Sequence, residues 1–155
     1  MRAVLTRVKS ACVTIDGQVV GKIGQGFLIL LGVGPQDTEA HSRYLAEKAL
    51  QLRIFEDAEG KMNCSLQQVG GEVLVVSQFT LYGNCRKGRR PSFTDAAPPE
   101  LGNRLYEQFL KDCEDLGFPP QHGRFGADMQ VESVNDGPVT LILDTEQLMD
   151  SPRRG

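Results

Sequence analysis

The stretch GFLILLGV, residues 26–33, constrains the fold more than any other part of the sequence. It is apolar on both faces of an extended chain, so both faces need cover. Bounding glycines and a short length indicate a strand, since a membrane-spanning helix needs ~18 apolar residues in a row. The segment GEVLVVSQFTL, residues 71–81, is a second strongly apolar strand. We therefore expect a central sheet with helices packed against it.

The segments around the first apolar strand supply its neighbours. Residues 2–15 have the alternation of a strand, and Asp16-Gly17 is a strong hairpin signal that leads into a second strand at 18–23. Pro35 ends the apolar strand. A helix is then expected from Asp37 or Thr38 to about residue 53, because either side chain is a suitable N-cap.

The second half of the chain predicts another helix and a final pair of strands. Pro98 and Pro99 stand where proline is favoured at the start of a helix. The segments MQVESV at 129–134 and PVTLILDT at 138–145 predict a last hairpin, closed by Asp136-Gly137.

The length of 155 residues and the element pattern favour an α/β fold in a single compact domain. We expect this domain to cover residues 1–145, with a mixed or antiparallel, barrel-like sheet and two main helices. Residues 146–155 are expected to be a flexible tail. The first residues lack the apolar core of a signal peptide, which favours a cytoplasmic location and no membrane partner.

The four cysteines are far apart, with no CxxC pair and no histidine at ligand spacing. This pattern argues against a disulfide framework and a zinc site, so we expect no metal or cofactor and reduced, mostly buried thiols.

A basic run, CRKGRRP at 85–91, stands out in a chain whose net charge is −3. Its cations are Arg86, Lys87, Arg89 and Arg90. Such a run is either a solvated loop or a local contact for nucleic-acid phosphates. The acidic balance of the whole chain does not by itself indicate a nucleic-acid-binding protein.

The usual catalytic motifs are absent from the sequence. Neither of the two histidines, His41 and His122, lies beside an obvious nucleophile, and there is no GxSxG, phosphate loop or HExxH motif. A Ser-His-Asp hydrolase is therefore poorly supported.

The polar residues at the end of the second apolar strand are candidates for a site, because a buried strand fixes the residues at its end. Ser77 and Thr80 carry hydroxyls, Gln78 carries a directional amide, and Phe79 offers an apolar surface. A strand end with alternating faces explains the same residues without any function.

The stretch VNDGPVT, residues 134–140, contains a proline directly after an apparent turn. Pro138 has no N–H for a ladder, so it belongs on an edge strand or at the start of a strand. The pair Gly137-Pro138 has no reactive side chain and offers only backbone carbonyls, which suggests that the backbone itself is functional.

Four segments together resemble one family, the D-aminoacyl-tRNA deacylases, which remove D-amino acids mistakenly esterified to tRNA. They are MRAVLTRVKSACVTIDG, GFLILLGV, SQFTLYGNCRKGRRPSF and FGADMQVESVNDGPVT. The resemblance spans residues 1–145. It implies an enzyme that hydrolyses the ester of D-aminoacyl-tRNA at the 3′ acceptor end.

The resemblance also implies a homodimer in which Gly137-Pro138, as a cis peptide, enters the active site of the partner. Enantiomers carry identical groups, so a rigid wall is needed that the L side chain must hit. Such a wall would let glycine pass, which implies activity on glycyl-tRNA. Arg7 resembles the residue that holds the carbonyls of this pair, although the strand alternation places it on an exposed face.

Further roles follow from the resemblance. Phe79 is implied to line the substrate pocket, and Phe125 and Met129 to lie near the terminal adenosine. All three types are equally compatible with packing in a core. The basic residues at 86–90 are implied to contact phosphates of the acceptor stem, which would make binding sensitive to salt.

The resemblance implies that the 2′-hydroxyl of the terminal ribose assists the attacking water. The alternative is Thr80 as the catalytic hydroxyl, with Ser77 and Gln78 as positioning groups or oxyanion donors. Three further functions stay open: a non-enzymatic nucleic-acid-binding module, an esterase acting on small acyl substrates through a protein hydroxyl, and a structural dimer in which NDGP is only a turn.

Overall fold

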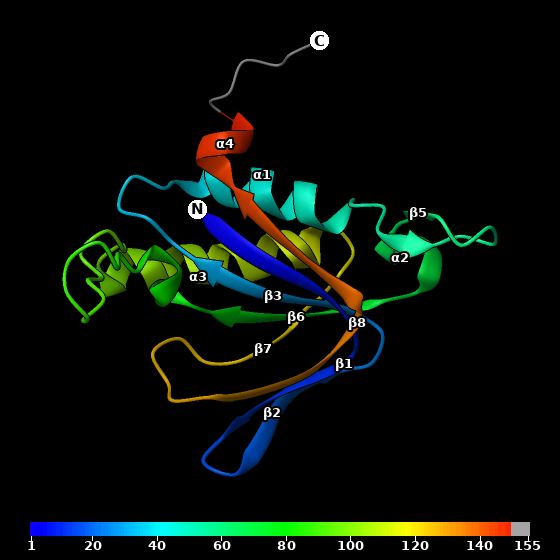
Figure 1. The fold of residues 1–155 in the computed structure, drawn as a ribbon, viewed down its shortest axis with the longest axis horizontal. Coiled ribbons are helices and arrows are strands. Elements are labelled where there is room, and N and C mark those ends of the chain that lie inside the picture. The colour runs from blue at the N-terminus through cyan, green and yellow to red at the C-terminus, as the bar shows by residue number, and fades with distance from the viewer. Residues whose placement is uncertain (150–155) are drawn as a thin grey trace.

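The computed structural model describes residues 1–149, which form a curled mixed sheet with helices packed on one side (Figure 1). The main sheet has six strands in the order β2-β1-β3-β6-β7, with β8 paired to the other side of β1. Its strands are β1 (Arg2–Ile15), β2 (Gln18–Ile23), β3 (Gly26–Gly32), β6 (Glu72–Ser77), β7 (Gln121–His122) and β8 (Gln130–Asp144). The remaining elements are α1 (Glu39–Leu50), β4 (Phe55–Glu56), β5 (Met62–Cys64), α2 (Leu66–Val69), the 3-10 helix η1 (Phe79–Tyr82), α3 (Pro99–Asp115) and α4 (Thr145–Met149).

The sheet bends so far that its two ends approach each other. A Cβ at Gly21 of β2 would lie 3.0 Å from the carbonyl oxygen of His122 in β7. The ladders of β3 with β6 and of β6 with β7 are parallel, and those of β1 with β2, β3 and β8 are antiparallel. The expected mixed, barrel-like α/β domain is therefore confirmed.

The two apolar strands carry core residues on both faces. Phe27 and Ile29 of β3 belong to the layer that also holds α1 and α3, whereas Leu28 belongs to a second cluster enclosed by the curled strands. β6 repeats this alternation between Val73 and Val76. The need for cover on both faces, inferred from the sequence, is met by helices on one side and by the sheet's own curvature on the other.

Two expectations about local structure are wrong. The strand expected over 71–81 ends at Ser77, and the next residues form η1. Hydrophobicity alone did not mark the end of the strand, because η1 also carries apolar residues and buries Tyr82. The thiols are not mostly buried: all four are free, but only Cys113 is buried and Cys85 is exposed.

The hairpin expected at Asp136-Gly137 is also wrong, because β8 is one continuous strand on β1. Val8 pairs with Asn135 and Thr6 pairs with Thr140, so residues 136–139 stand opposite Arg7 alone. This region is a large bulge in an edge strand, a place where proline is tolerated. Both halves of β8 pair with the long β1 rather than with each other, and this tertiary partner overrides the local turn signal.

A buried arginine fills the space beneath the bulge. Arg7 is 5 % exposed, so its expected place on an exposed face is wrong. Arg7 continues the buried face of Ala3 and Leu5. The alternation of β1 breaks at Val8, which is also buried and lies where the register with β8 shifts. The Arg7 Nε donates to the Asp136 carbonyl at 2.8 Å, and Nη1 donates to the Ile54 carbonyl at 2.6 Å.

Asn135 holds the bulge from within β8. Its Oδ1 accepts a hydrogen bond from the Val139 N–H at 2.8 Å, and its Nδ2 donates to the Thr140 hydroxyl at 3.0 Å. Gly137 has a φ of +132°, a conformation that L side chains rarely adopt. The Gly137–Pro138 peptide bond is cis.

The chain beyond β8 continues directly into a short helix. α4 takes residues 145–149, so residues 146–149 of the segment expected as a flexible tail are helical, and residues 150–155 of that segment lie outside the described residues. Every helix within residues 1–149 is too short or too polar to cross a lipid bilayer.

Because Arg7 donates hydrogen bonds to carbonyls of the bulge and of the segment after α1, we expect the stability of the fold to depend on its guanidinium. Arg7→Met keeps an unbranched side chain but leaves the carbonyls of Asp136 and Ile54 without this donor. Because each buried unpaired polar group costs about 1–3 kcal/mol, we expect the free energy of unfolding in urea to fall by about 2–4 kcal/mol. The matched control is Lys9→Ala on the same strand, where the exposed side chain predicts a change within about 0.5 kcal/mol. Equal stabilities of the two variants would contradict the prediction.

Candidate active site

A cavity of about 530 Å³ opens where β3 and β6 end and α3 begins. Buried apolar residues at the ends of the two parallel strands form its floor, and the start of α3 forms one wall. Its lining residues are Leu31, Val33, Val76, Ser77, Gln78, Phe79, Phe93, Ala96, Ala97, Pro99, Gly102, Tyr106, Phe125, Gly126, Ala127, Met129 and Val131. Ligand sites in α/β sheets commonly lie at the carboxyl ends of strands, so this is the candidate active site.

The sequence singled out four residues at the end of the second apolar strand as candidates for a site. Three of them line this cavity, namely Ser77, Gln78 and Phe79. The Gln78 N–H donates to the Leu31 carbonyl at 2.7 Å, which ties the turn after β6 to β3. Thr80 is exposed and is not among the lining residues. Its hydroxyl accepts a hydrogen bond from the Gln78 side-chain amide.

Phe125 and Met129 both line the cavity, and both also pack against glycines. A Cβ at Gly102 of α3 would lie 3.1 Å from the Phe125 ring, and a Cβ at Gly123 would lie 2.4 Å from the Met129 sulfur. Each of these two side chains therefore both packs against the protein and lines the cavity. Their contact with a terminal adenosine stays a prediction.

The chemistry of the cavity is set by what its walls contain. Among the residues that line it, Tyr106 is the one titratable side chain, and burial raises its pKa well above the usual range. Its hydroxyl donates to the Val75 carbonyl at 3.1 Å. The walls thus offer a hydroxyl, an amide and aromatic surface, but no carboxylate, imidazole, amine or thiol to act as a general base.

Neither histidine is among the residues that line the cavity, since His41 stands at the start of α1 and His122 lies in the short strand β7. The Nδ1 of His41 accepts a hydrogen bond from the Thr38 N–H at 3.0 Å, at the start of α1. His122 is exposed, and its Nδ1 lies 2.7 Å from the Gly123 carbonyl oxygen. These contacts agree with a structural role, rather than a catalytic one, for both histidines.

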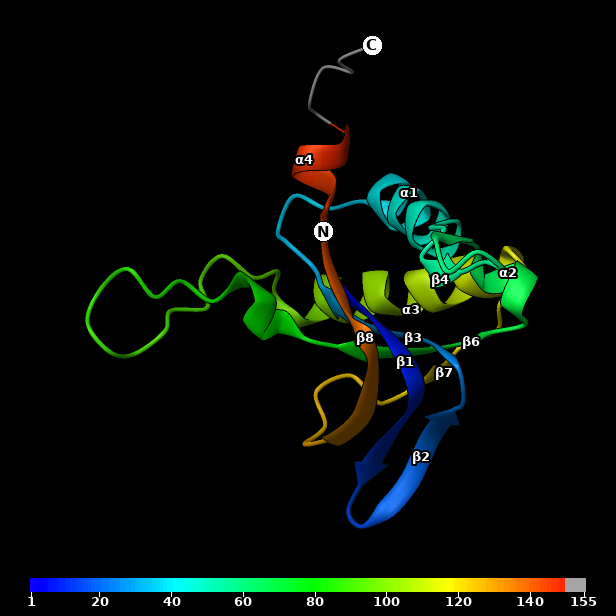
Figure 2. The same ribbon diagram turned by 45° about the vertical axis from the view of Figure 1, so that its right-hand side comes forward.

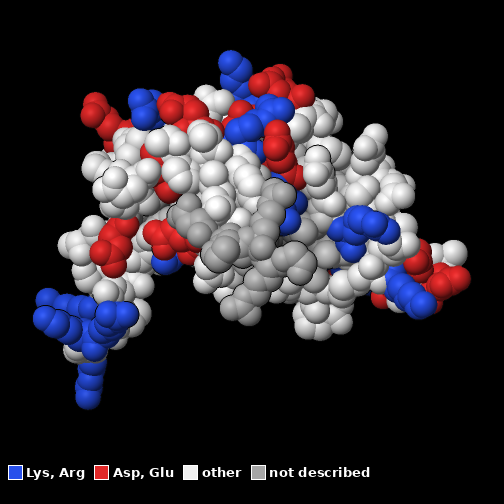
Figure 3. Space-filling model, turned by 90° about the horizontal axis from the view of Figure 1, so that it is seen from above, with Lys and Arg blue, Asp and Glu red and all other residues white. Residues whose placement is uncertain are grey.

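The basic run forms a projecting loop, residues 84–92, which we call the basic arm. Asn84 and Ser92 close its base through two backbone hydrogen bonds of 2.7 and 2.8 Å. The loop extends away from the body of the molecule (Figure 2), and Lys and Arg gather at the matching end of the surface (Figure 3). Its exposed cations are Arg86, Lys87, Arg89 and Arg90.

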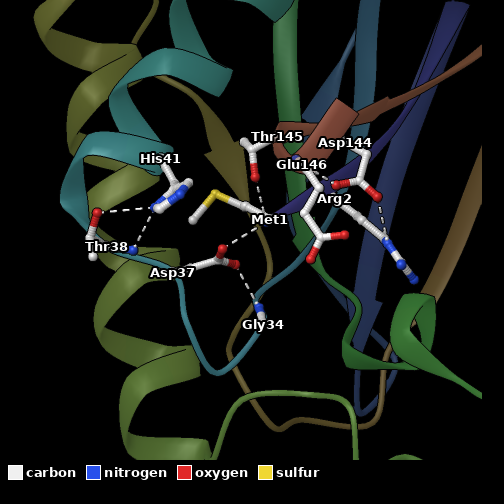
Figure 4. A network of polar contacts seen from close by, with 9 residues as sticks. All are labelled: Met1, Arg2, Gly34, Asp37, Thr38, His41, Asp144, Thr145 and Glu146. Atoms are coloured by element: carbon white, nitrogen blue, oxygen red, sulfur yellow. Dashed lines mark hydrogen bonds and ion pairs between the residues drawn. The ribbon is translucent and has the colours of Figure 1, made fainter. Parts of the chain in front are cut away.

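A second, more polar cavity of about 640 Å³ lies at the root of the arm, with Arg86, Asp37 and Glu146 among its lining residues. Beside it lies a network of polar contacts (Figure 4). The amino group of Met1 donates to Asp37 Oδ1 and to the Thr145 hydroxyl, each at 2.8 Å.

In the same network the Arg2 Nε donates to Asp144 Oδ2 at 2.9 Å, and the Arg2 guanidinium lies 4.5 Å from the centre of the Tyr82 ring. These contacts tie the start of β1 to the end of β8 and to η1, so the network is a structural frame for the arm.

The bulge residues Gly137 and Pro138 are exposed and are not among the lining residues of the cavity in their own subunit. Arg7 lies beneath the bulge, and its hydrogen bond reaches the carbonyl of Asp136, the residue before the Gly137–Pro138 pair. The expected contact of this pair with the active site of a partner subunit stays a prediction.

Sequence reasoning missed Phe93, Tyr106 and the Gly126-Ala127 pair as lining residues. Tyr106 lies in the apolar stripe of α3 and looks like core. Phe93 had a signal, because it is an aromatic residue three positions after a basic run, an arrangement suited to nucleic-acid strands.

Comparison with known proteins shows which family the chain belongs to. The profile of the family described as D-Tyr-tRNA(Tyr) deacylase matches residues 4–144. The chain is 60% identical over 146 residues to the D-aminoacyl-tRNA deacylase of Desulfatibacillum aliphaticivorans, covering 94% of this chain and 100% of that protein. It is 55% identical over 148 residues to the enzyme of the same name from Thermosipho africanus, covering 96% of this chain and 99% of that one.

Two solved structures have the same fold. A c-Myc DNA unwinding element binding protein superposes with a TM-score of 0.87 at 41% identity, over 93% of this chain and 98% of that chain. A probable eukaryotic D-amino acid tRNA deacylase superposes with a TM-score of 0.79 at 18% identity, over 92% and 97%. On the match over residues 4–144 and the identity to curated relatives, the chain belongs to the D-Tyr-tRNA(Tyr) deacylase family.

Proposed function

We propose that this protein hydrolyses the ester of D-aminoacyl-tRNAs in the cytoplasm, releasing the D-amino acid and free tRNA. The observation that carries the proposal is a cavity whose walls hold a hydroxyl, an amide and aromatic rings but no general base. An aminoacyl ester is already activated, so its hydrolysis does not require a strong protein nucleophile. Family membership supplies the substrate class.

The missing base is provided by the substrate in this mechanism. Water adds to the ester carbonyl carbon and gives its proton to the 2′-hydroxyl of the terminal ribose, which passes its own proton to the 3′ oxygen. The tetrahedral intermediate then breaks the bond to the 3′ oxygen, which leaves with a proton. Ser77 and the Gln78 amide position the carbonyl group and stabilise the negative charge that develops on its oxygen.

In this proposal, the bulge of a second subunit distinguishes D-aminoacyl from L-aminoacyl esters. We place Gly137–Pro138 of one copy at the mouth of the other copy's cavity, because the pair is exposed on an edge strand and projects from its own sheet. Two contacts fix its backbone from behind: Arg7 to Asp136, and Asn135 to Val139. A fixed main chain cannot rotate away from an L side chain, whereas glycine has no side chain to reject.

The basic arm binds the acceptor stem in this proposal. Four exposed cations on a projecting loop can follow RNA phosphates without reading sequence, as an enzyme acting on many tRNAs requires. Phe125 and Met129 provide the apolar surface for the terminal adenine within the cavity.

A second candidate is a nucleic-acid-binding module without hydrolytic activity. The similar structure described as a c-Myc DNA unwinding element binding protein, together with the basic arm, favours this alternative. Such a module would bind charged and uncharged RNA equally and leave both enantiomers of an aminoacyl ester intact.

The deciding measurement is deacylation of one tRNA charged with D- or L-forms of the same amino acid, and with glycine. We expect the D-ester to be cleaved at least about a hundredfold faster than the L-ester, because the L side chain collides with the bulge. Glycyl-tRNA should be cleaved as well. Equal rates for the enantiomers would remove chiral selection, and RNA binding without any cleavage would favour the binding module.

Replacing Thr80 separately tests whether the protein supplies the nucleophile. Thr80→Ala and Thr80→Val should each keep kcat within about tenfold, since the hydroxyl lies outside the cavity walls and pairs with Gln78. Ser77→Ala removes a hydroxyl that does line the cavity, and should lower kcat by about a hundredfold. Loss of nearly all activity in both Thr80 variants, with RNA binding intact, would instead identify Thr80 as the nucleophile.

The arm is tested by the salt dependence of tRNA binding. The double variant Arg89→Ala/Arg90→Ala should reduce the slope of log K against log salt by about 2, as two phosphate contacts are lost. The matched control, Lys22→Ala/Lys111→Ala, removes the same charge from exposed positions on β2 and α3. An identical slope in the two double variants would show that the arm does not contact phosphates.

A further inference from the structure

Two phenylalanine rings stand exposed at the mouth of the active-site cavity. Phe79 is 55 % exposed and Phe93 is 39 % exposed, yet both line the cavity. Their ring centres are 5.2 Å apart with an interplanar angle of 73°, an edge-to-face pair. Such exposed apolar surface at an entrance marks a place where a ligand binds.

The pair is held in place before any ligand arrives. Phe93 follows directly after Ser92, whose backbone pairs with Asn84 at the base of the arm. A Cβ at Gly83 would lie 3.1 Å from the Phe93 ring, so the ring packs on bare backbone. Phe79 is the first residue of η1, which is tied to β3 through the Gln78 N–H.

The pair also lies on the path between two RNA-binding features. Arg90, the last cation of the arm, is three residues before Phe93, a distance of at most ~10 Å along the chain. The cavity begins on the other side of the rings. An RNA strand whose phosphates contact the arm and whose end enters the cavity would therefore pass close to Phe93 and its neighbour Phe79.

We propose that Phe79 and Phe93 form a stacking platform for the unpaired nucleotides that precede the terminal adenosine, with the penultimate base lying on the Phe93 ring. This inference rests on the proposed function for the identity of the RNA end. The acceptor end of tRNA is single-stranded, and proteins bind such ends by stacking splayed bases on aromatic rings. Stacking tolerates any base, and it orients the ester without adding chemistry to the cavity.

The test is a double-mutant cycle between the protein ring and the RNA base. One partner is Phe93→Leu, which keeps an apolar side chain at the cavity mouth, with Phe93→Tyr as the variant that keeps the ring. The other is an acceptor-stem minihelix with a complete 3′ CCA end, compared with one in which the penultimate nucleotide is abasic. The quantities measured are the Kd of the uncharged minihelices and kcat/KM of the D-aminoacylated ones.

With the complete RNA, Phe93→Leu should weaken binding by about tenfold, and Phe93→Tyr should bind within about twofold of the unchanged protein. With the abasic RNA, all three proteins should bind equally, because the stacking partner is gone. The Arg89→Ala/Arg90→Ala variant serves as a contrast, since it should lose affinity for both RNAs.

Three results would overturn the platform. An equal loss by Phe93→Leu on both RNAs would mean that the ring only shapes the cavity. No loss on either RNA would mean that the ring has no partner in the RNA. A change of oligomeric state in Phe93→Leu, measured by sedimentation, would assign the ring to a contact between subunits. The Kd values of the uncharged minihelices complete the double-mutant cycle without any hydrolysis. A protein that lacks deacylase activity can therefore still pass or fail the test of the platform.

Discussion

The β1–β8 ladder, interrupted opposite one buried arginine, is the constraint on which the other features depend. β1 pairs with three strands, and its partners on one side change from β3 to β2 along its length. Arg7 lies near this change, where the ladder to β8 slips and the alternation of faces breaks. Its guanidinium satisfies carbonyls from the bulge and from the segment after α1, so one planar group joins three parts of the chain.

In the proposed function, the cavity binds the reacting ester and the bulge of a second copy selects the enantiomer. The cavity walls carry binding groups without a base, which suits a substrate that brings its own hydroxyl next to an activated ester. The bulge carries a fixed backbone without a reactive group, which suits rejection by shape. Neither feature resembles the catalytic constellations built from histidine and carboxylate.

The fold could be predicted well where burial follows a simple period. The two apolar strands, the proline-capped α3 and the first hairpin all follow from local patterns that tertiary contacts reinforce. Prediction failed at 134–140, where Asp136-Gly137 has the composition of a tight turn but both flanking halves pair with β1. It failed again at Arg7, because an arginine in a strand is normally placed on the exposed face, whereas Arg7 lies on the buried face together with Ala3 and Leu5.

The sequence by itself determined the family, an α/β domain with a central sheet and two main helices, and the short polar segment after β6 that borders the cavity. These follow from periodicity and from motifs that are contiguous in the chain. Only the tertiary structure decided that Gly137–Pro138 lies in a bulge, that Arg7 is buried beneath it, and that Phe93 meets Phe79 at the cavity mouth. Each of these depends on strand register or loop packing between distant segments, and local propensity carries no information about which of several partners a strand will choose.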